Sequence, residues 1–131
     1  MAVDDNRRLI RRYFEVIDRG PLDKALELVE EVVAEDYVAH MAGVTLRGRE
    51  ALRGQLRNAY ATFSDMQHLV EDEIAEGDKV VTRARFRAIQ NGAFLGIAPS
   101  GRRLECTIIY INRFSRGRLH ENDDMVHNLA I

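Results

Sequence analysis

The sequence predicts an α+β domain in which three helices pack on one face of a curved antiparallel sheet. Apolar residues recur every three or four positions in the first half of the chain, which is typical of amphipathic helices. From Met66 onward the pattern changes to that of strands bounded by turn residues. At 131 residues the chain suits one domain with a sizeable core, so we treat residues 1–131 as a single unit.

Three segments carry apolar residues at helical spacing: 9–17, 22–33 and 52–63. Gly20 and Pro21 separate the first two, because Pro21 suits the first turn of a new helix. We therefore expect a helical hairpin. A short extended piece at 36–40 and a turn at 43–48 lead into the third helix.

The second half predicts strands in two hairpins, over residues 69–74, 79–88, 104–114 and 119–127. The loop 91–101 between the hairpins contains glycine, proline and the apolar residues Phe94, Leu95 and Ile97. It suits either the rim of an apolar pocket or a contact with a second subunit. A sheet curled around helices that do not fill it leaves a cavity on its concave face, where we expect the functional site.

Composition excludes several classes of function. Nineteen basic and twenty-one acidic residues give a net charge of −2, so no strong positive field is present to attract nucleic acid or an anionic membrane. No segment approaches the roughly 20 apolar residues of a membrane span, and residues 1–6 do not resemble a signal peptide. The single cysteine, Cys106, has no intramolecular disulfide partner, which favours a reducing compartment, and we expect a cytoplasmic protein.

The final strand contains an acidic run that its strand propensity does not explain. Asp123 and Asp124 are adjacent, so alternation along the strand directs one of them towards the core, without deciding which. A buried carboxylate with a raised pKa can remove a proton from a carbon acid near neutral pH. The alternative is a solvated edge strand that carries charge to prevent aggregation.

Two residues on other strands are candidates to assist such chemistry. Tyr110 lies opposite the acidic strand, and its phenol can donate a hydrogen bond to a developing enolate or simply belong to the core. His40 ends the extended piece, where it contacts a substrate oxygen or has only a structural role. His120 and His127 lie among the acids but lack the spacing of a metal site, so we expect no metal.

Five short motifs are the most distinctive parts of the chain: Asp36-Tyr37-Val38-x-His40, Gly48-x-Glu50-Ala51-Leu52, the turn and strand 76–83, the loop 92–102, and the hairpin 113–119. Together with the order of the elements, they resemble the SnoaL-like polyketide cyclase family. This family shares a cone-shaped α+β fold with nuclear transport factor 2 and ketosteroid isomerase. The resemblance covers nearly the whole chain, and it implies a cone in which the curved sheet wraps around the three helices.

The resemblance also implies a reaction: intramolecular aldol closure of a polyketide ester without metal or organic cofactor. The family's general base is an aspartate on the last strand, which corresponds to Asp124 here. Its assisting histidine corresponds to Tyr110, which is a departure from the family pattern. Many members carry a tryptophan near the position of Asp123, whereas this chain has no tryptophan.

We therefore expect a cofactor-free enzyme that binds a small, largely apolar, carbonyl-containing molecule in the cone. Asp124 is the expected base, and Tyr110 and His40 are expected to hold the enolate oxygen. The residues expected to bind the substrate are Tyr13, Tyr37, Phe63, Phe86, Phe94, Ile97 and Asn122. We also expect a homodimer formed through the outer face of the sheet, including Ile109 and Ile111.

Two alternatives remain at this stage. Epoxide hydrolysis, as in limonene epoxide hydrolase, requires an inward arginine beside an inward aspartate. Arg83, Arg85 and Arg87 alternate along one strand and are expected to form a solvated outer face, with no aspartate beside them, which argues against this reaction. The second alternative is a non-catalytic module that binds a ligand or a partner, because a fold does not fix a function.

Overall fold

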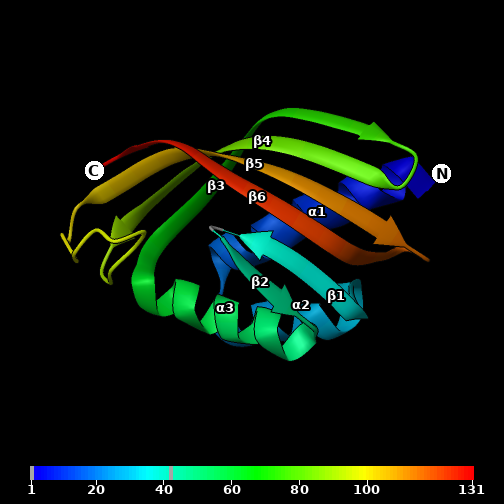
Figure 1. Cartoon of the computed structure of the whole chain (residues 1–131), viewed down its shortest axis with the longest axis horizontal. Coiled ribbons are helices and arrows are strands. Elements are labelled where there is room, and N and C mark those ends of the chain that lie inside the picture. The colour runs from blue at the N-terminus through cyan, green and yellow to red at the C-terminus, as the bar shows by residue number, and fades with distance from the viewer. Residues whose placement is uncertain (1, 42) are drawn as a thin grey trace.

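A computed structural model describes residues 2–41 and 43–131, and over these residues three helices pack against a sheet of six strands (Figure 1). The helices are α1 (Ala2–Arg19), α2 (Leu22–Val32) and α3 (Arg49–Thr62). The strands are β1 (Val33–Met41), β2 (Val44–Arg47), β3 (Phe63–Glu76), β4 (Lys79–Gln90), β5 (Arg103–Ser115) and β6 (Arg118–Ala130). The predicted α+β fold with a curved sheet around the helices is confirmed.

The order of the strands in the sheet is β2-β1-β6-β5-β4-β3. β3, β4, β5 and β6 form an antiparallel meander, as expected, but β1 and β6 run parallel, so the sheet is mixed. The expected turn at 43–48 contains the short strand β2, which pairs with β1. β6 therefore joins the β1–β2 hairpin to the rest of the sheet.

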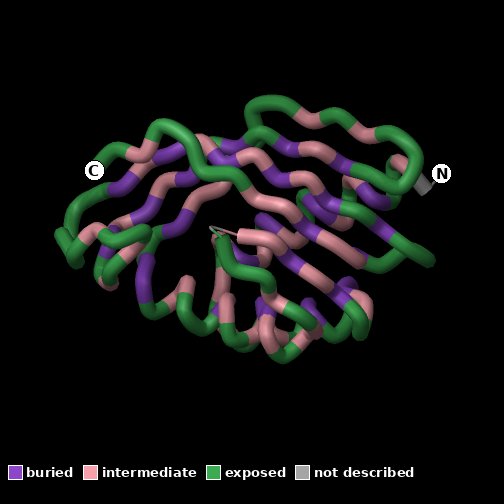
Figure 2. Tube along the Cα trace, in the orientation of Figure 1, coloured by how far each residue is buried: buried purple, intermediate pink, exposed green. Residues whose placement is uncertain are grey.

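The core lies between the helices and the concave face of the sheet. α1 contributes Ile10, Phe14 and Ile17 to it, and all three are buried, in keeping with their helical spacing. Strand residues alternate between the two faces, which Figure 2 shows as alternating colours along the tube. None of the helices within the described ranges is long and apolar enough to cross a membrane.

The outer face of the sheet carries the alternating arginines, as expected. Arg85 Nη2 lies 3.0 Å from Glu71 Oε2, and Arg87 Nε lies 3.2 Å from Glu105 Oε2. Arg83 is also on this face, with about half of its side chain exposed. These charges are paired in water and point away from the core.

Candidate active site

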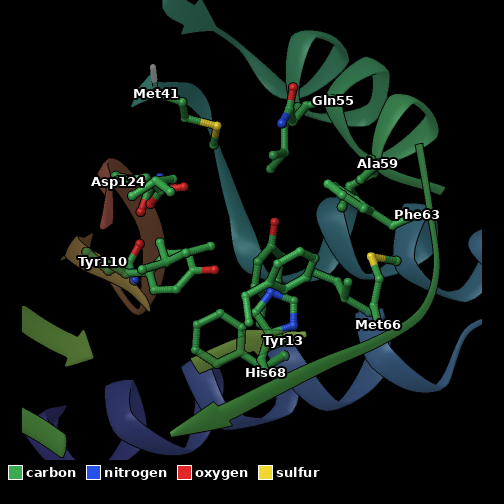
Figure 3. A pocket seen from close by; sticks show the side chains of 18 of the residues that line it. Tyr13, Met41, Gln55, Ala59, Phe63, Met66, His68, Tyr110 and Asp124 are labelled. Atoms are coloured by element: carbon green, nitrogen blue, oxygen red, sulfur yellow. The ribbon is translucent and has the colours of Figure 1, made fainter. Parts of the chain in front are cut away.

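A cavity of about 200 Å³ lies between the helices and the concave face of the sheet, where the cone is not filled by side chains. Its walls come from α1, α3 and the strands, and the loop between β4 and β5 contributes Phe94 and Leu95. Most of the lining is aromatic or aliphatic, with a few polar groups among it (Figure 3). Such a mostly apolar cavity with a few convergent polar groups is typical of a small-molecule site.

Asp124 is the carboxylate that lines this cavity. It pairs with Tyr110 across β5 and β6, and side chains directly opposite each other in a sheet share a face. Asp123 pairs with Ile111 and therefore points to the other side. Alternation, together with the register of β6, thus separates the two adjacent carboxylates, one inside the cone and one outside.

Burial raises the pKa of Asp124 from 3.8 to about 7, because the apolar surroundings disfavour the charged carboxylate. The nearby charge of Asp123 raises this pKa further, whereas the Asn122 side chain acts in the opposite direction. The Oδ1 atom of Asp124 is buried and has no hydrogen-bond partner among the residues that the structure describes. An oxygen of this kind is available to a bound ligand.

Three tyrosines from different elements line the same cavity: Tyr13 from α1, Tyr37 from β1 and Tyr110 from β5. Loss of solvent and the charge of Asp124 raise the pKa of all three phenols, so they keep their protons near neutral pH. Within the described ranges, only the fourth tyrosine, Tyr60, places its hydroxyl on a protein acceptor, the Ile17 carbonyl at 2.6 Å. The other phenols are free to donate to a ligand.

The structure also brings a histidine to the cavity that sequence reasoning missed. His68, on β3, lines the cavity, and its Nδ1 lies 2.6 Å from Asp18 Oδ1 on α1. The backbone N–H of His68 donates to the other oxygen of the same carboxylate, at 2.7 Å. The imidazole stacks on Phe14, with 4.9 Å between ring centroids, and Phe14 in turn contacts Tyr110. Figure 3 shows His68 and Asp124 entering the cavity from different walls.

One signal in the sequence points to Asp18, although not to its partner. Asp18 lies in the last turn of α1, where the helix dipole disfavours a negative charge. An acid at that position indicates that a partner elsewhere compensates for the unfavourable dipole. The expected strand began at residue 69, so His68 fell outside it, whereas β3 begins at Phe63.

The structure brings most of the expected site residues together. Those that line the cavity are Asp124, Tyr110, Tyr13, Tyr37, Phe63, Phe86, Phe94 and Asn122. His40 does not reach it: Tyr37 and Met41 line the cavity, and alternation along β1 turns His40 to the outer face, where Nδ1 lies 3.3 Å from Thr45 Oγ1. Ile97 is also outside the cavity, although a backbone bridge in the loop pairs it with Phe94, which lines the cavity.

The remaining polar groups limit what else the site can hold. Among the described residues, no group of three or more histidine, cysteine or acidic side chains is placed to bind a metal ion. Cys106 is buried in the core, and burial raises the pKa of its thiol to about 11. No arginine in the described part of the chain lines the cavity, so the inward Arg–Asp arrangement of an epoxide hydrolase is not formed.

The helices and curved sheet have the same fold as a nuclear transport factor 2-like protein from Burkholderia pseudomallei, which superposes with a TM-score of 0.75 at 19% identity, covering 93% of this chain and 90% of its own. Residues 7–131 match the family model of the SnoaL-like polyketide cyclases, and the chain belongs to that family. A search of curated proteins finds no significant match.

Several solved structures have the same fold. A candidate SnoaL-like polyketide cyclase from Jannaschia sp. CCS1 superposes with a TM-score of 0.82 at 23% identity, covering 94% of this chain and 85% of its own. IdmH from Streptomyces antibioticus, a candidate polyketide cyclase, superposes with a TM-score of 0.75 at 29% identity, covering 92% of this chain and 90% of its own. A protein with a ketosteroid isomerase-like fold from Catenulispora acidiphila, solved with trimethylamine, superposes with a TM-score of 0.72 at 15% identity, covering 89% of this chain and 83% of its own.

Proposed function

We propose that this protein is a cofactor-independent acid–base enzyme that acts on a carbonyl compound bound in the cone. Its reaction class is the intramolecular aldol closure of a polyketide cyclase or a related isomerisation. The observation that carries the proposal is Asp124, a carboxylate in an apolar cavity with a pKa of about 7 and one oxygen without a protein partner. A base is most effective when its pKa lies near the working pH, which for this carboxylate is near neutral.

In the proposed mechanism, Asp124 removes a proton from the carbon next to a carbonyl group. The C–H electron pair forms an enolate, whose oxygen accepts a hydrogen bond from the phenol of Tyr110, the cross-strand neighbour of Asp124. Tyr13 and Tyr37 supply further phenols in the same cavity. The enolate carbon then attacks a second carbonyl of the same molecule, which closes the ring.

The size of the cavity narrows the class of substrate. Its volume of about 200 Å³ is a little more than the roughly 150 Å³ that hold a benzene molecule in an engineered apolar cavity. We infer that one ring, or a segment of that size, enters the cone while the rest of a larger substrate stays at its mouth. Leu95 and Val126 line the cavity and are partly exposed, so they suit contact with that outer part.

The test uses nitrobenzisoxazole, a compact carbon acid whose ring opens when a base removes its carbon-bound proton. The C–H electron pair becomes the third bond of a nitrile and the N–O bond breaks, so the opened ring carries a coloured phenolate. We expect Asp124→Asn to lower the rate by roughly 100-fold or more. The rate should rise with pH around a midpoint of about 7, because the base must be ionised.

The matched control is Asp123→Asn, which makes the same change on the adjacent residue outside the cone. This variant should keep the rate, and its midpoint should fall, because the charge of Asp123 raises the pKa of Asp124. Full activity of Asp124→Asn would contradict the proposed base.

A second candidate is a binding protein for a small organic ammonium ion. An aromatic cavity around a single carboxylate suits such a cation, which the rings attract through their faces. If calorimetry detects trimethylamine binding that Asp124→Asn weakens, and no ring opening is catalysed, this binding function replaces the enzymatic one.

We also propose that the protein acts as a homodimer in the cytoplasm. Ile109 and Ile111 are half-buried on the outer face of the sheet, and Ile109 pairs with Met125, which is 52% exposed. An apolar strip at this position suits a second copy of the chain. Gel filtration should give a dimer, and a monomer at high concentration would contradict this part of the proposal.

A further inference from the structure

We propose that His68, held by Asp18, is a second acid–base group of the cavity, which gives a proton to the oxygen left when the new bond forms. This inference rests on the proposed function, because it supplies the proton that the oxygen needs once Asp124 has acted on carbon. The observations that support the role of His68 are independent of Asp124. They come from the contact between α1 and β3, on a different wall of the cavity from Asp124.

The contact between Asp18 and His68 fixes both the position and the tautomer of the imidazole. One carboxylate oxygen accepts from Nδ1, at 2.6 Å, and the other accepts from the backbone N–H of the same histidine, at 2.7 Å. Because Nδ1 carries the shared proton, Nε2 is the nitrogen left for a ligand. Stacking on Phe14, with 15° between the ring planes, further restricts rotation of the imidazole.

Burial distinguishes this pair from an ordinary surface contact. The His68 and Asp18 side chains are only 9% and 23% exposed. A second pair in the chain, His120 and Asp36, has 3.3 Å between its atoms and is 41% and 75% exposed. His68 lines the cavity and Asp18 contacts this histidine from α1, whereas neither residue of the second pair lines the cavity, so only the first histidine can meet a substrate.

The proton balance of the reaction assigns a role to His68. Asp124 takes a proton from carbon, and attack of the enolate on the second carbonyl converts that C=O pair into an alkoxide. The imidazolium of His68 then gives its Nε2 proton to the alkoxide and becomes neutral. The proton held by Asp124 returns to His68 through solvent at the mouth of the cavity, which restores both groups. Substrate and product are isomers. His68 is thus a catalytic residue and Asp18 a positioning residue.

The first test compares two probes that differ in their leaving group. The phenolate formed from nitrobenzisoxazole is weakly basic and needs no proton, whereas that formed from unsubstituted benzisoxazole is more basic and benefits from an acid. We expect His68→Gln to lower the rate on the unsubstituted probe about tenfold more than on the nitro probe. Asp18→Asn should change the ratio of the two rates in the same direction, and the control His120→Gln should leave the ratio unchanged.

The outcomes separate the two proposals. If His68→Gln lowers both rates by the same factor, His68 only packs in the wall, and the inference is overturned while Asp124 keeps its role. If Asp124→Asn keeps full activity, the proposed function falls instead. Absence of any acceleration by the unmodified protein with either probe overturns both.

The second test does not depend on turnover. Nitrogen NMR of the imidazole rings is recorded while para-nitrophenolate, a planar oxyanion of one ring, is added to the protein. The Nε2 signal of His68 should move, its Nδ1 signal should stay that of a protonated nitrogen, and the signals of His120 should not change. If Nε2 of His68 stays unmoved up to the solubility limit of the phenolate, the inference is overturned.

Discussion

Charged side chains on the two faces of the β4–β5–β6 sheet differ in solvation and in pairing. On the outer face Arg85 and Arg87 alternate towards water and pair with Glu71 and Glu105 at 3.0–3.5 Å. On the inner face Asp124 is surrounded by apolar groups and leaves one oxygen without a partner among the described residues. The same backbone ladder carries both arrangements, because side chains alternate along each strand. A charge is made inert on one face and reactive on the other by its surroundings alone.

The physical difference is desolvation. An ion pair in water contributes roughly 0–1 kcal/mol, because solvent and salt screen it and both side chains must be held in place. A carboxylate taken out of water without a cation loses its hydration, so its proton is held more tightly. The inner carboxylate therefore destabilises the folded protein whenever it is ionised, and the outer charges hardly affect stability.

The largest expected effect is on the pH dependence of stability. The pKa of Asp124 is about 7 in the folded chain and about 3.8 when unfolded, so the folded state holds a proton that the unfolded state has lost between these values. Stability must then fall as pH rises through this window and level off above it, by about 4 kcal/mol in all. Urea unfolding of Asp124→Asn should show no such fall. The free energy of unfolding of the variant should therefore increase relative to that of the unmodified protein as pH rises.

Asp123→Asn is again the matched control, and it should retain most of the fall in stability between pH 4 and 8. A fall of equal size in Asp124→Asn and the unmodified protein would mean that the inner carboxylate is hydrated, and the contrast between the two faces would disappear.

A smaller effect separates two tyrosines. Tyr110→Phe removes a phenol that faces the cavity and keeps the ring that packs on Phe14, so the rate of ring opening of unsubstituted benzisoxazole, whose product oxygen benefits from a donor, should fall about 100-fold while stability changes little. Tyr60→Phe removes a hydroxyl that donates to the Ile17 carbonyl, so it should cost about 1 kcal/mol of stability and leave the rate unchanged. The measurements are a rate assay and urea unfolding on both variants. Equal rates for the two variants would refute the role of Tyr110.

The smallest effect is expected on the outer face. Arg85→Gln breaks its pairs with Glu71 and Glu105, yet we expect a change in stability below about 1 kcal/mol, declining with added salt, and no change in rate. Unfolding should be measured below the concentration at which the protein self-associates. A loss of several kcal/mol would show that the outer charges are as strongly coupled to folding as the inner one.

Local patterns in the sequence predicted the helices and the two hairpins, because helical spacing and turn residues act over a few positions. Pairing between distant segments was out of reach of such patterns. The parallel contact of β1 with β6 joins residues more than 80 positions apart, and β2 is only four residues long between two glycines. Both depend on the assembled sheet, which no short window of sequence describes.

The site residues were likewise predictable where local patterns decide their position, and not where distant segments do. Alternation showed that one of Asp123 and Asp124 is inward, but choosing Asp124 needed the family resemblance, and the register of β6 now gives the physical reason. His40 was expected in the cavity with Tyr37, although an odd separation of three residues places two strand residues on opposite faces. His68 was missed because its partner Asp18 lies 50 residues away.

The place of β6 in the sheet also has a consequence for folding kinetics. β6 follows the other strands in sequence but lies between β1 and β5, so until it pairs, the β1–β2 hairpin is not joined to the β3–β4–β5 meander. Contacts of such long sequence separation close late, because loop entropy must be lost before they form. The cone therefore stays open until the strand that bears Asp124 is inserted. Any state in which β6 is unpaired exposes the apolar lining of the cavity, and the carboxylate becomes buried only in the step that completes the sheet.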